Sequence, residues 1–296
     1  MFKKKISGFI LAFLSIQAFS SIQAFSFNWP QTGQVSAESF SLYFGQLRGE
    51  TINSSLIFSG STDIYAADSG FLTVVIVEYE DDSCFFPSTL GNAVVIAHQD
   101  SLLTVYGNID GQTLPDTIRD ASEISGGTEL GKSGSSAWSE KGNALEFQVI
   151  DIKNNTAMNP RILMPRISGK ELPLYISGIV LQGRNGRSYK IPEQSTIPAG
   201  FYRAYYRRQP TATPYKTYMS LNGNVVDEIS FDMLRQDGNL ICAVGKKNYP
   251  KSVLYPNDEL ILMGEVTFAH GKNSLQYYVS DILGKENIAT YNITNY

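Results

Sequence analysis

The chain has 296 residues, of which 43% are hydrophobic, enough for one large folded domain or two of ordinary size. A net charge of −4 gives no basic footprint for nucleic acid, and two cysteines are too few for a small disulfide-stapled fold. Cys84 and Cys242 could form one bridge or remain two buried thiols. The 17 tyrosines and 16 phenylalanines, together with many short apolar runs, favour strands over helices.

The N-terminus has the pattern of an export signal. "MFKKK" precedes the apolar stretch "ISGFILAFLSIQAF", which is short for a membrane span. The hexapeptide "SIQAFS" then occurs twice, at 15–20 and 21–26, and each copy ends in the small-x-small pattern Ala-Phe-Ser. We expect residues 1–26 to be a signal peptide, cleaved so that a secreted or periplasmic chain begins at Phe27. The alternative is an uncleaved anchor. No cysteine lies near the cut to carry a lipid, and no later stretch predicts a membrane span.

Short strands separated by turns are predicted after the signal. "FLTVVIVEYE" (71–80) is a β-rich run, and "NAVVIAH" (92–98) and "LLTVYGNI" (102–109) follow it, separated by a short polar segment. "GNALEFQVID" (142–151) alternates apolar and polar residues, as a half-buried strand does. The glycine-rich stretch 124–138 predicts a loop, and it lacks the spacing of a phosphate-binding loop.

Three prolines and a glycine in residues 160–173 predict a break in the chain, and we place a domain boundary between 168 and 169. Beyond it, short strands alternate with turn signals such as Asn185-Gly186 and Asn222-Gly223. The segment 271–287 resembles the last strand of bacterial immunoglobulin-like modules. We therefore expect residues 169–296 to form an immunoglobulin-like β-sandwich.

Six motifs follow one another between residues 44 and 166. They are "FGQLRG" (44–49), "DIYAADSGFLTVV" (63–75), "GNAVVIAHQDSLLTVYGNI" (91–109), "ISGGTELGKSGSSA" (124–137), "GNALEFQVID" (142–151) and "NPRILM" (159–164). Together they resemble the lysostaphin/LytM-type family of peptidoglycan endopeptidases. The resemblance implies a LytM-type β-sheet domain, similar to a duplicated hybrid motif, over residues 27–168. The whole protein would then be all-β.

The resemblance also implies a zinc site. In the family, a His-x-x-x-Asp pair and the second histidine of His-x-His bind the metal. A histidine from Tyr-x-His and the first of His-x-His assist catalysis. A catalytic zinc needs three protein ligands and an open position for water, and neighbouring imidazoles move protons near neutral pH.

Other residues hold these positions in this sequence. The His-x-His pair falls on Ala144 and Glu146, and the Tyr-x-His histidine falls on Asn108. The His-x-x-x-Asp pair aligns best with Asn53 and Ile57, and a shift to residues 50 and 54 supplies no histidine either. Alanine offers no donor atom, asparagine does not titrate, and one glutamate does not hold a catalytic zinc.

Counting histidines supports the same conclusion. The chain has two, His98 and His270, whereas the family chemistry needs four. His98 matches a family histidine outside the metal site, and we expect it to be a hydrogen-bonded strand residue. His270 lies in the second half of the chain. We therefore expect no metal, no other cofactor and no catalytic residues at the family positions.

The function that follows is that of a noncatalytic exported cell-envelope protein, which binds or regulates a cell-wall hydrolase or binds peptidoglycan. Inactive LytM-type domains are known as regulators of amidases. The alternatives are an active zinc endopeptidase with unusual ligands and a purely structural envelope module. We expect a remaining groove, with Glu146 as a negative centre that suits a basic or neutral protein segment. The candidate groove residues are Tyr106, Asn108, Ala144, Glu146 and Gln148.

The aromatic and basic run "FYRAYYRRQPTATPYKTY" (201–218) allows two interpretations. Tyrosine stacks on sugar faces and arginine pairs with acids, so the run could bind glycan or an anionic polymer. The simpler interpretation, which we favour, is a strand with one packed face and one solvated face.

Overall fold

The computed structural model describes residues 27–60, 62–77, 88–137 and 142–296. The predicted signal peptide (1–26) and Cys84 lie outside these ranges, while Cys242 is buried. The described chain is built almost entirely of strands, so the prediction of an all-β fold is confirmed. None of its helices is long and apolar enough to cross a membrane.

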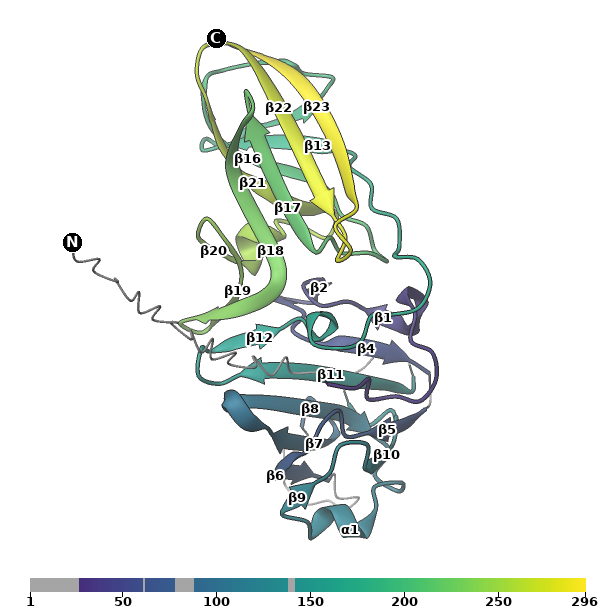
Figure 1. Ribbon diagram of the computed structural model, residues 1–296. Helices are drawn as coiled ribbons and strands as arrows, with labels where there is room; N and C mark the ends of the chain where they lie inside the picture. Colours follow the sequence, from purple (N-terminus) through teal and green to yellow (C-terminus); the bar gives the residue numbers. More distant parts are fainter. Residues whose placement is uncertain (1–26, 61, 78–87, 138–141) are drawn as a thin grey trace, which may run out of the picture.

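The elements divide between two halves of the molecule (Figure 1). The strands of the first half are β1 (Phe40–Leu42), β2 (Leu47–Arg48), β3 (Thr51–Ile52), β4 (Leu56–Ser59), β5 (Asp63–Tyr65), β6 (Gly70–Ile76), β7 (Asn92–Ala97), β8 (Leu102–Ile109), β9 (Glu123–Ile124), β10 (Glu129–Lys132), β11 (Ala144–Asp151) and β12 (Thr156–Met158). Those of the second half are β13 (Ile179–Gly183), β14 (Ser188–Ile191), β15 (Thr196–Ile197), β16 (Gly200–Arg207), β17 (Lys216–Leu221), β18 (Asn224–Asp237), β19 (Leu240–Gly245), β20 (Asn248–Pro250), β21 (Leu260–Phe268), β22 (Gly271–Ser280) and β23 (Glu286–Asn295). The short helices are η1 (Ala37–Ser39), η2 (Gln99–Ser101), α1 (Asp116–Arg119), η3 (Pro160–Ile162) and α2 (Lys251–Leu254).

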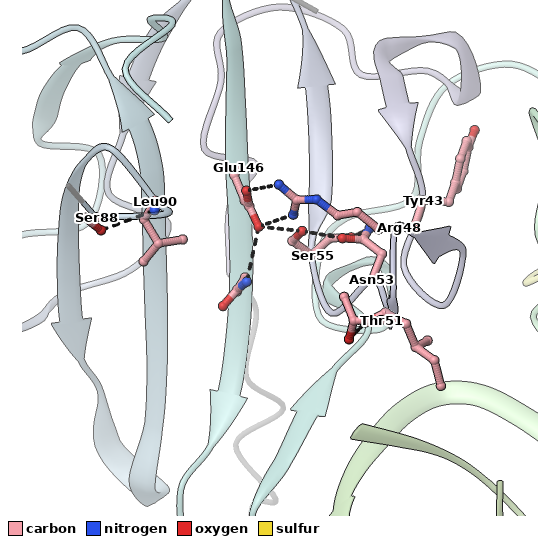
Figure 2. Close-up of polar contacts among 10 residues, drawn as sticks. Tyr43, Arg48, Thr51, Asn53, Ser55, Ser88, Leu90 and Glu146 are labelled. Carbon is pink, nitrogen blue, oxygen red and sulfur yellow. Dashed lines mark hydrogen bonds and ion pairs between the residues drawn. The ribbon is translucent and has the colours of Figure 1, made fainter. Parts of the chain in front are cut away.

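The first half is organised around β11, which pairs antiparallel with β8 along one edge. Its other edge is shared, because β4 pairs with residues 144–147 and β12 pairs with residues 149–151. Alternation along β11 turns Leu145, Phe147 and Val149 into the core, where each is fully buried. Glu146 therefore faces the opposite side of the sheet, where the β2–β3 segment lies (Figure 2).

The second half contains two β-sheets, which pack against each other around a common core. One sheet has the strand order β14-β13-β16-β21. The other runs β15-β23-β22-β17-β18, with β19 paired to β18 and β20 paired to β19. The inner residues of β16 and β21 include Tyr206 and Ile261, and those of the facing sheet include Met219 and Tyr277. The second half is thus β-rich and layered.

One long strand joins the two halves. Residues 156–158 of β12 pair antiparallel with residues 233–235 of β18, so a single hydrogen-bonded sheet runs from one half into the other. Asn159 strengthens this junction, because its backbone N–H donates to the Asp232 carbonyl at 2.8 Å and its side chain donates to the Phe231 carbonyl at 3.0 Å. Buried residues of both halves also belong to one continuous core.

The segment that carries β2 and β3 is clamped by the second half. The Tyr255 hydroxyl donates to the Gly45 carbonyl at 2.6 Å, and the Phe231 ring packs directly against Gly45. The Gln46 amide donates to the Pro210 carbonyl at 3.3 Å, and Lys251 pairs with exposed Glu50 at 2.9 Å. These contacts fix the backbone on both sides of β2.

Candidate functional site

A bidentate ion pair occupies the centre that the family motifs define. Arg48, at the end of β2, points toward β11 and its guanidinium meets the Glu146 carboxylate (Figure 2). The Nη1–Oε1 distance is 2.7 Å and the Nη2–Oε2 distance is 2.9 Å. The Glu146 side chain is 6% exposed and that of Arg48 is 31% exposed. Two parallel charge-assisted hydrogen bonds of this kind are strong and fix the orientation of both groups.

Two further side chains surround the carboxylate. The Ser55 hydroxyl lies 3.0 Å from Glu146 Oε1 and 2.8 Å from Asn53 Oδ1, so its single proton is shared between two acceptors. The Gln148 amide donates to Glu146 Oε1 at 3.3 Å. The Asn53 amide nitrogen donates to the Tyr43 and Ser55 carbonyls, at 2.8 and 2.7 Å. The centre is a closed hydrogen-bonded network.

Four of the family positions lie on β11 or on the strands β4 and β8 that pair with it. Ile57 lies directly opposite Glu146 in the β4–β11 register, and Ala144 lies opposite Ser59. Asn108 is buried at the end of β8 in the left-handed region, with φ at 64°, a conformation that asparagine tolerates better than most residues.

The side chain of Asn108 is fully engaged with the backbone. Its amide nitrogen donates to the carbonyls of Gly134 and Ala144, each at 2.7 Å, and its oxygen accepts the Ala137 N–H at 2.8 Å. All three partners are main-chain groups, two of them in the 134–137 loop. Asn108 therefore ties that loop to the start of β11.

The structure corrects the groove that we expected from the sequence. Tyr106 pairs with Phe147 in the β8–β11 register, so it points to the opposite face of the sheet from Glu146. Tyr106 is fully buried, its hydroxyl accepts the Ala67 N–H at 2.7 Å, and burial raises its pKa to about 12. Of the other candidates, Asn108 and Ala144 are also buried, and Gln148 is partly exposed.

The expected negative centre is also wrong, because the Arg48 guanidinium neutralises Glu146. Arg48 is the arginine of the motif "FGQLRG", so the sequence placed it in the region of the site. No local pattern linked it to a glutamate 98 residues away.

The residues at this centre do not fit a catalytic zinc ion. Ile57 and Ala144 have no donor atoms, and the Asn108 amide is already bound to the backbone. Glu146 is the single carboxylate among the family positions, and a guanidinium cation is bound to it. Within the described part of the chain, no three His, Cys, Asp or Glu side chains are grouped so that they could hold a metal ion. No zinc-dependent step follows from this arrangement.

His98 lies outside this centre, directly after β7, and both of its ring nitrogens have partners. Nδ1 lies 2.9 Å from the Ser69 carbonyl oxygen and Nε2 lies 2.7 Å from the Thr104 hydroxyl. The Phe27 ring meets the imidazole edge to face, at 5.0 Å between centroids. This confirms the expectation of a hydrogen-bonded residue. Burial is the main cause that lowers the pKa of His98 below 6.5.

We expect an NMR titration to give a His98 midpoint below 6.5. Protonation then favours the unfolded chain. The contribution of His98 to stability is therefore present above the unfolded-state pKa and is lost as pH falls from that value through the lower folded-state pKa. His98→Gln should make the free energy of unfolding less sensitive to pH below 6.5. The matched control is His270→Gln, which replaces the exposed histidine. The spectrum of this variant also shows which of the two histidine signals belongs to His98. A His98 midpoint at or above 6.5 would contradict this expectation.

The fold and centre define a β-sheet domain whose strand β11 carries a nearly buried salt bridge. The model of peptidase family M23 matches residues 54–160, and this chain belongs to that family through that domain. A second family model, which carries no description, matches residues 173–296. An uncharacterized protein of Treponema pallidum (strain Nichols) is 31% identical over 119 residues, which are 37% of this chain and 77% of that protein.

Solved structures show weaker likeness. A chain in the structure of the SpoIIQ-SpoIIIAH pore forming complex has 20% sequence identity to this protein and a TM-score of 0.34. The match covers 49% of this chain and 94% of that one. A mutant form of the catalytic domain of the prophage-encoded M23 protein EnpA from Enterococcus faecalis is 22% identical, with a TM-score of 0.32. That match covers 46% of this chain and 95% of that one.

Proposed function

We propose that this protein is a noncatalytic, exported member of peptidase family M23, which binds or regulates a cell-wall hydrolase or binds peptidoglycan. The observation that carries the proposal is the Arg48–Glu146 ion pair. It places a permanent cation beside the one carboxylate that stands at a former ligand position. The export pattern of residues 1–26 supports a place in the periplasm or outside the cell.

The chemistry of the centre argues against hydrolysis. Attack on an amide needs an activated water molecule, which the family obtains from a metal ion and nearby imidazoles. Here the candidate base is held in a bidentate salt bridge, and His98 is hydrogen-bonded on another part of the sheet. A metal ion at Glu146 would have to displace the guanidinium and then lie close to it, which like-charge repulsion opposes.

We further propose that residues 27–168 and 169–296 are two domains that act as one rigid unit. The family matches at 54–160 and 173–296 support the division. The β12–β18 pairing and the clamp on β2 support the rigid unit. A rigid noncatalytic scaffold suits a binding role, because little conformational entropy is lost when it engages a partner.

Metal analysis of the purified chain tests the noncatalytic part of the proposal. We expect no stoichiometric zinc and no release of fragments from cross-linked peptidoglycan. Ala144→His combined with Glu146→His should not restore either property, because Asn53 and Ile57 still replace the His-x-x-x-Asp pair. One tightly bound zinc per chain, or cleavage that a chelator abolishes, would instead support an active peptidase with unusual ligands.

A binding experiment tests the other part. A pull-down from envelope extract beside sedimentation with purified sacculi separates a protein partner from peptidoglycan. Capture of a hydrolase, or co-sedimentation with sacculi, supports the corresponding role. The absence of both would favour a purely structural module.

A further inference from the structure

A second polar site lies in the other half of the chain, on the outer side of the β13–β16–β21 sheet. The cavity there has a volume of about 660 Å³, a size typical of small-molecule and short-peptide sites. Gln182, Arg203 and Glu265 stand opposite one another on three neighbouring strands, so they form one cross-strand row on one face. Arg184, Phe201 and Lys247 complete the lining.

Three cations and one carboxylate line this cavity, and two of the cations pair with the carboxylate. Arg203 Nε lies 3.1 Å from Glu265 Oε1, and Lys247 Nζ lies 2.7 Å from Glu265 Oε2. The exposed Arg184 guanidinium lies over the Phe201 ring, 4.6 Å from its centroid, and makes no ion pair within the part of the chain that the structure describes. The cavity wall is therefore positive on a chain whose net charge is −4.

Asp227 is another negative group near this row, but it is buried and does not line the cavity. Its carboxylate accepts the Tyr249 hydroxyl at 2.5 Å and the backbone N–H groups of Glu265 and Glu228, at 2.7 and 2.8 Å. These hydrogen bonds hold Asp227 behind β21 and fix the strand from which Glu265 projects. Asp227 is thus part of the support of the site.

We propose that this cavity binds an acidic peptide that presents at least two carboxylates. Glu265 occupies the site as an internal carboxylate and marks where a ligand carboxylate would meet Arg203 and Lys247. Arg184 is preorganised by its stacking on Phe201 and offers the edge of its guanidinium to a second carboxylate. The stem peptides of peptidoglycan and an acidic segment of a protein share this chemistry.

The same geometry disfavours a neutral glycan. A sugar ring needs an open aromatic face, and Arg184 covers that of Phe201. Tyr202, Tyr205 and Tyr206 are buried, which agrees with the simpler interpretation of the aromatic and basic run as a packed strand. The polar side chains that line the cavity and can contact a ligand are charged groups and the Gln182 amide.

Fluorescence anisotropy with a labelled peptide of alternating glutamate and glycine tests the proposal. At low salt, Arg184→Gln and Arg203→Gln should each weaken binding by about fivefold or more, as expected when a charge-assisted hydrogen bond is lost. Glu265→Gln should strengthen binding severalfold, because it frees Arg203 and Lys247 for the ligand. Lys272→Gln removes the same charge from an exposed position on β22 and should leave binding unchanged.

Equal binding of a glutamine-containing peptide, or Arg203→Gln and Lys272→Gln variants that behave alike, would overturn the proposal. If the site binds the acidic peptide, sedimentation with purified sacculi identifies the source. Arg203-dependent pelleting indicates stem peptides, and its absence indicates an acidic protein segment. The site does not depend on the noncatalytic state of the M23 domain, so the zinc measurement and this experiment can fail independently.

Discussion

Replacing Arg48 with methionine should lower the free energy of unfolding by roughly 2–4 kcal/mol. The substitution leaves the Glu146 carboxylate almost fully buried, with Ser55 and Gln148 as its remaining donors. Removing one partner of a buried ion pair costs more than the pair contributes, because the other charge stays desolvated. Urea denaturation of the purified chain measures the effect.

A double-mutant cycle separates the ion pair from simple loss of packing. Arg48→Met combined with Glu146→Gln should recover most of the lost stability, because no unpaired charge is then buried. Arg187→Met is the matched control, since Arg187 is exposed in the β13–β14 turn and should change stability by less than about 0.5 kcal/mol. If Arg48→Met and Arg187→Met have equal effects, the pair does not stabilise the centre.

Replacing Gly45 with alanine should also destabilise the protein by roughly 2–4 kcal/mol, through a different cause. Gly45 has a φ of 82°, and an added Cβ would lie 2.5 Å from Cδ1 of the Phe231 ring. Phe231 belongs to β18, the strand that joins the two halves, and it is buried. The ring cannot move without disturbing that junction, so the strain should reach the backbone that positions Arg48.

Gly49→Ala is the control for this substitution. Gly49 also has a positive φ, at 54°, and lies in the same segment, but an added Cβ would meet nothing within 4 Å. It should cost only about 1 kcal/mol, from the left-handed conformation alone. Thermal unfolding of the two variants compares the two contributions. Equal melting temperatures would show that the Phe231 contact does not clamp the segment.

Much of the fold was predictable because it depends on local patterns. The alternating apolar residues of 142–151 and the apolar runs at 92–98 and 102–109 indicated strands, and the structure places β11, β7 and β8 there. The small number of histidines was also visible without coordinates, since the chain has two and the family resemblance implies four.

The direction and partners of the site residues depended on tertiary structure. Tyr106 belongs to a family motif, yet the β8–β11 register turns it into the core beside Phe147. Register is fixed by strand pairing over the whole sheet, and a shift of one residue would reverse the face of every side chain.

The amino-acid sequence was enough to identify a domain of the M23 type in a chain that has fewer histidines than the zinc chemistry of the family uses. What occupies the centre follows from the tertiary structure. Arg48 reaches Glu146 because β4 pairs with β11 on one side, while Tyr255 and Phe231 from the second half hold the backbone before β2. Arg48 and Glu146 lie 98 positions apart and Gly45 and Tyr255 lie 210 apart, and no local pattern encodes such contacts. The packing of the folded chain alone brings them together.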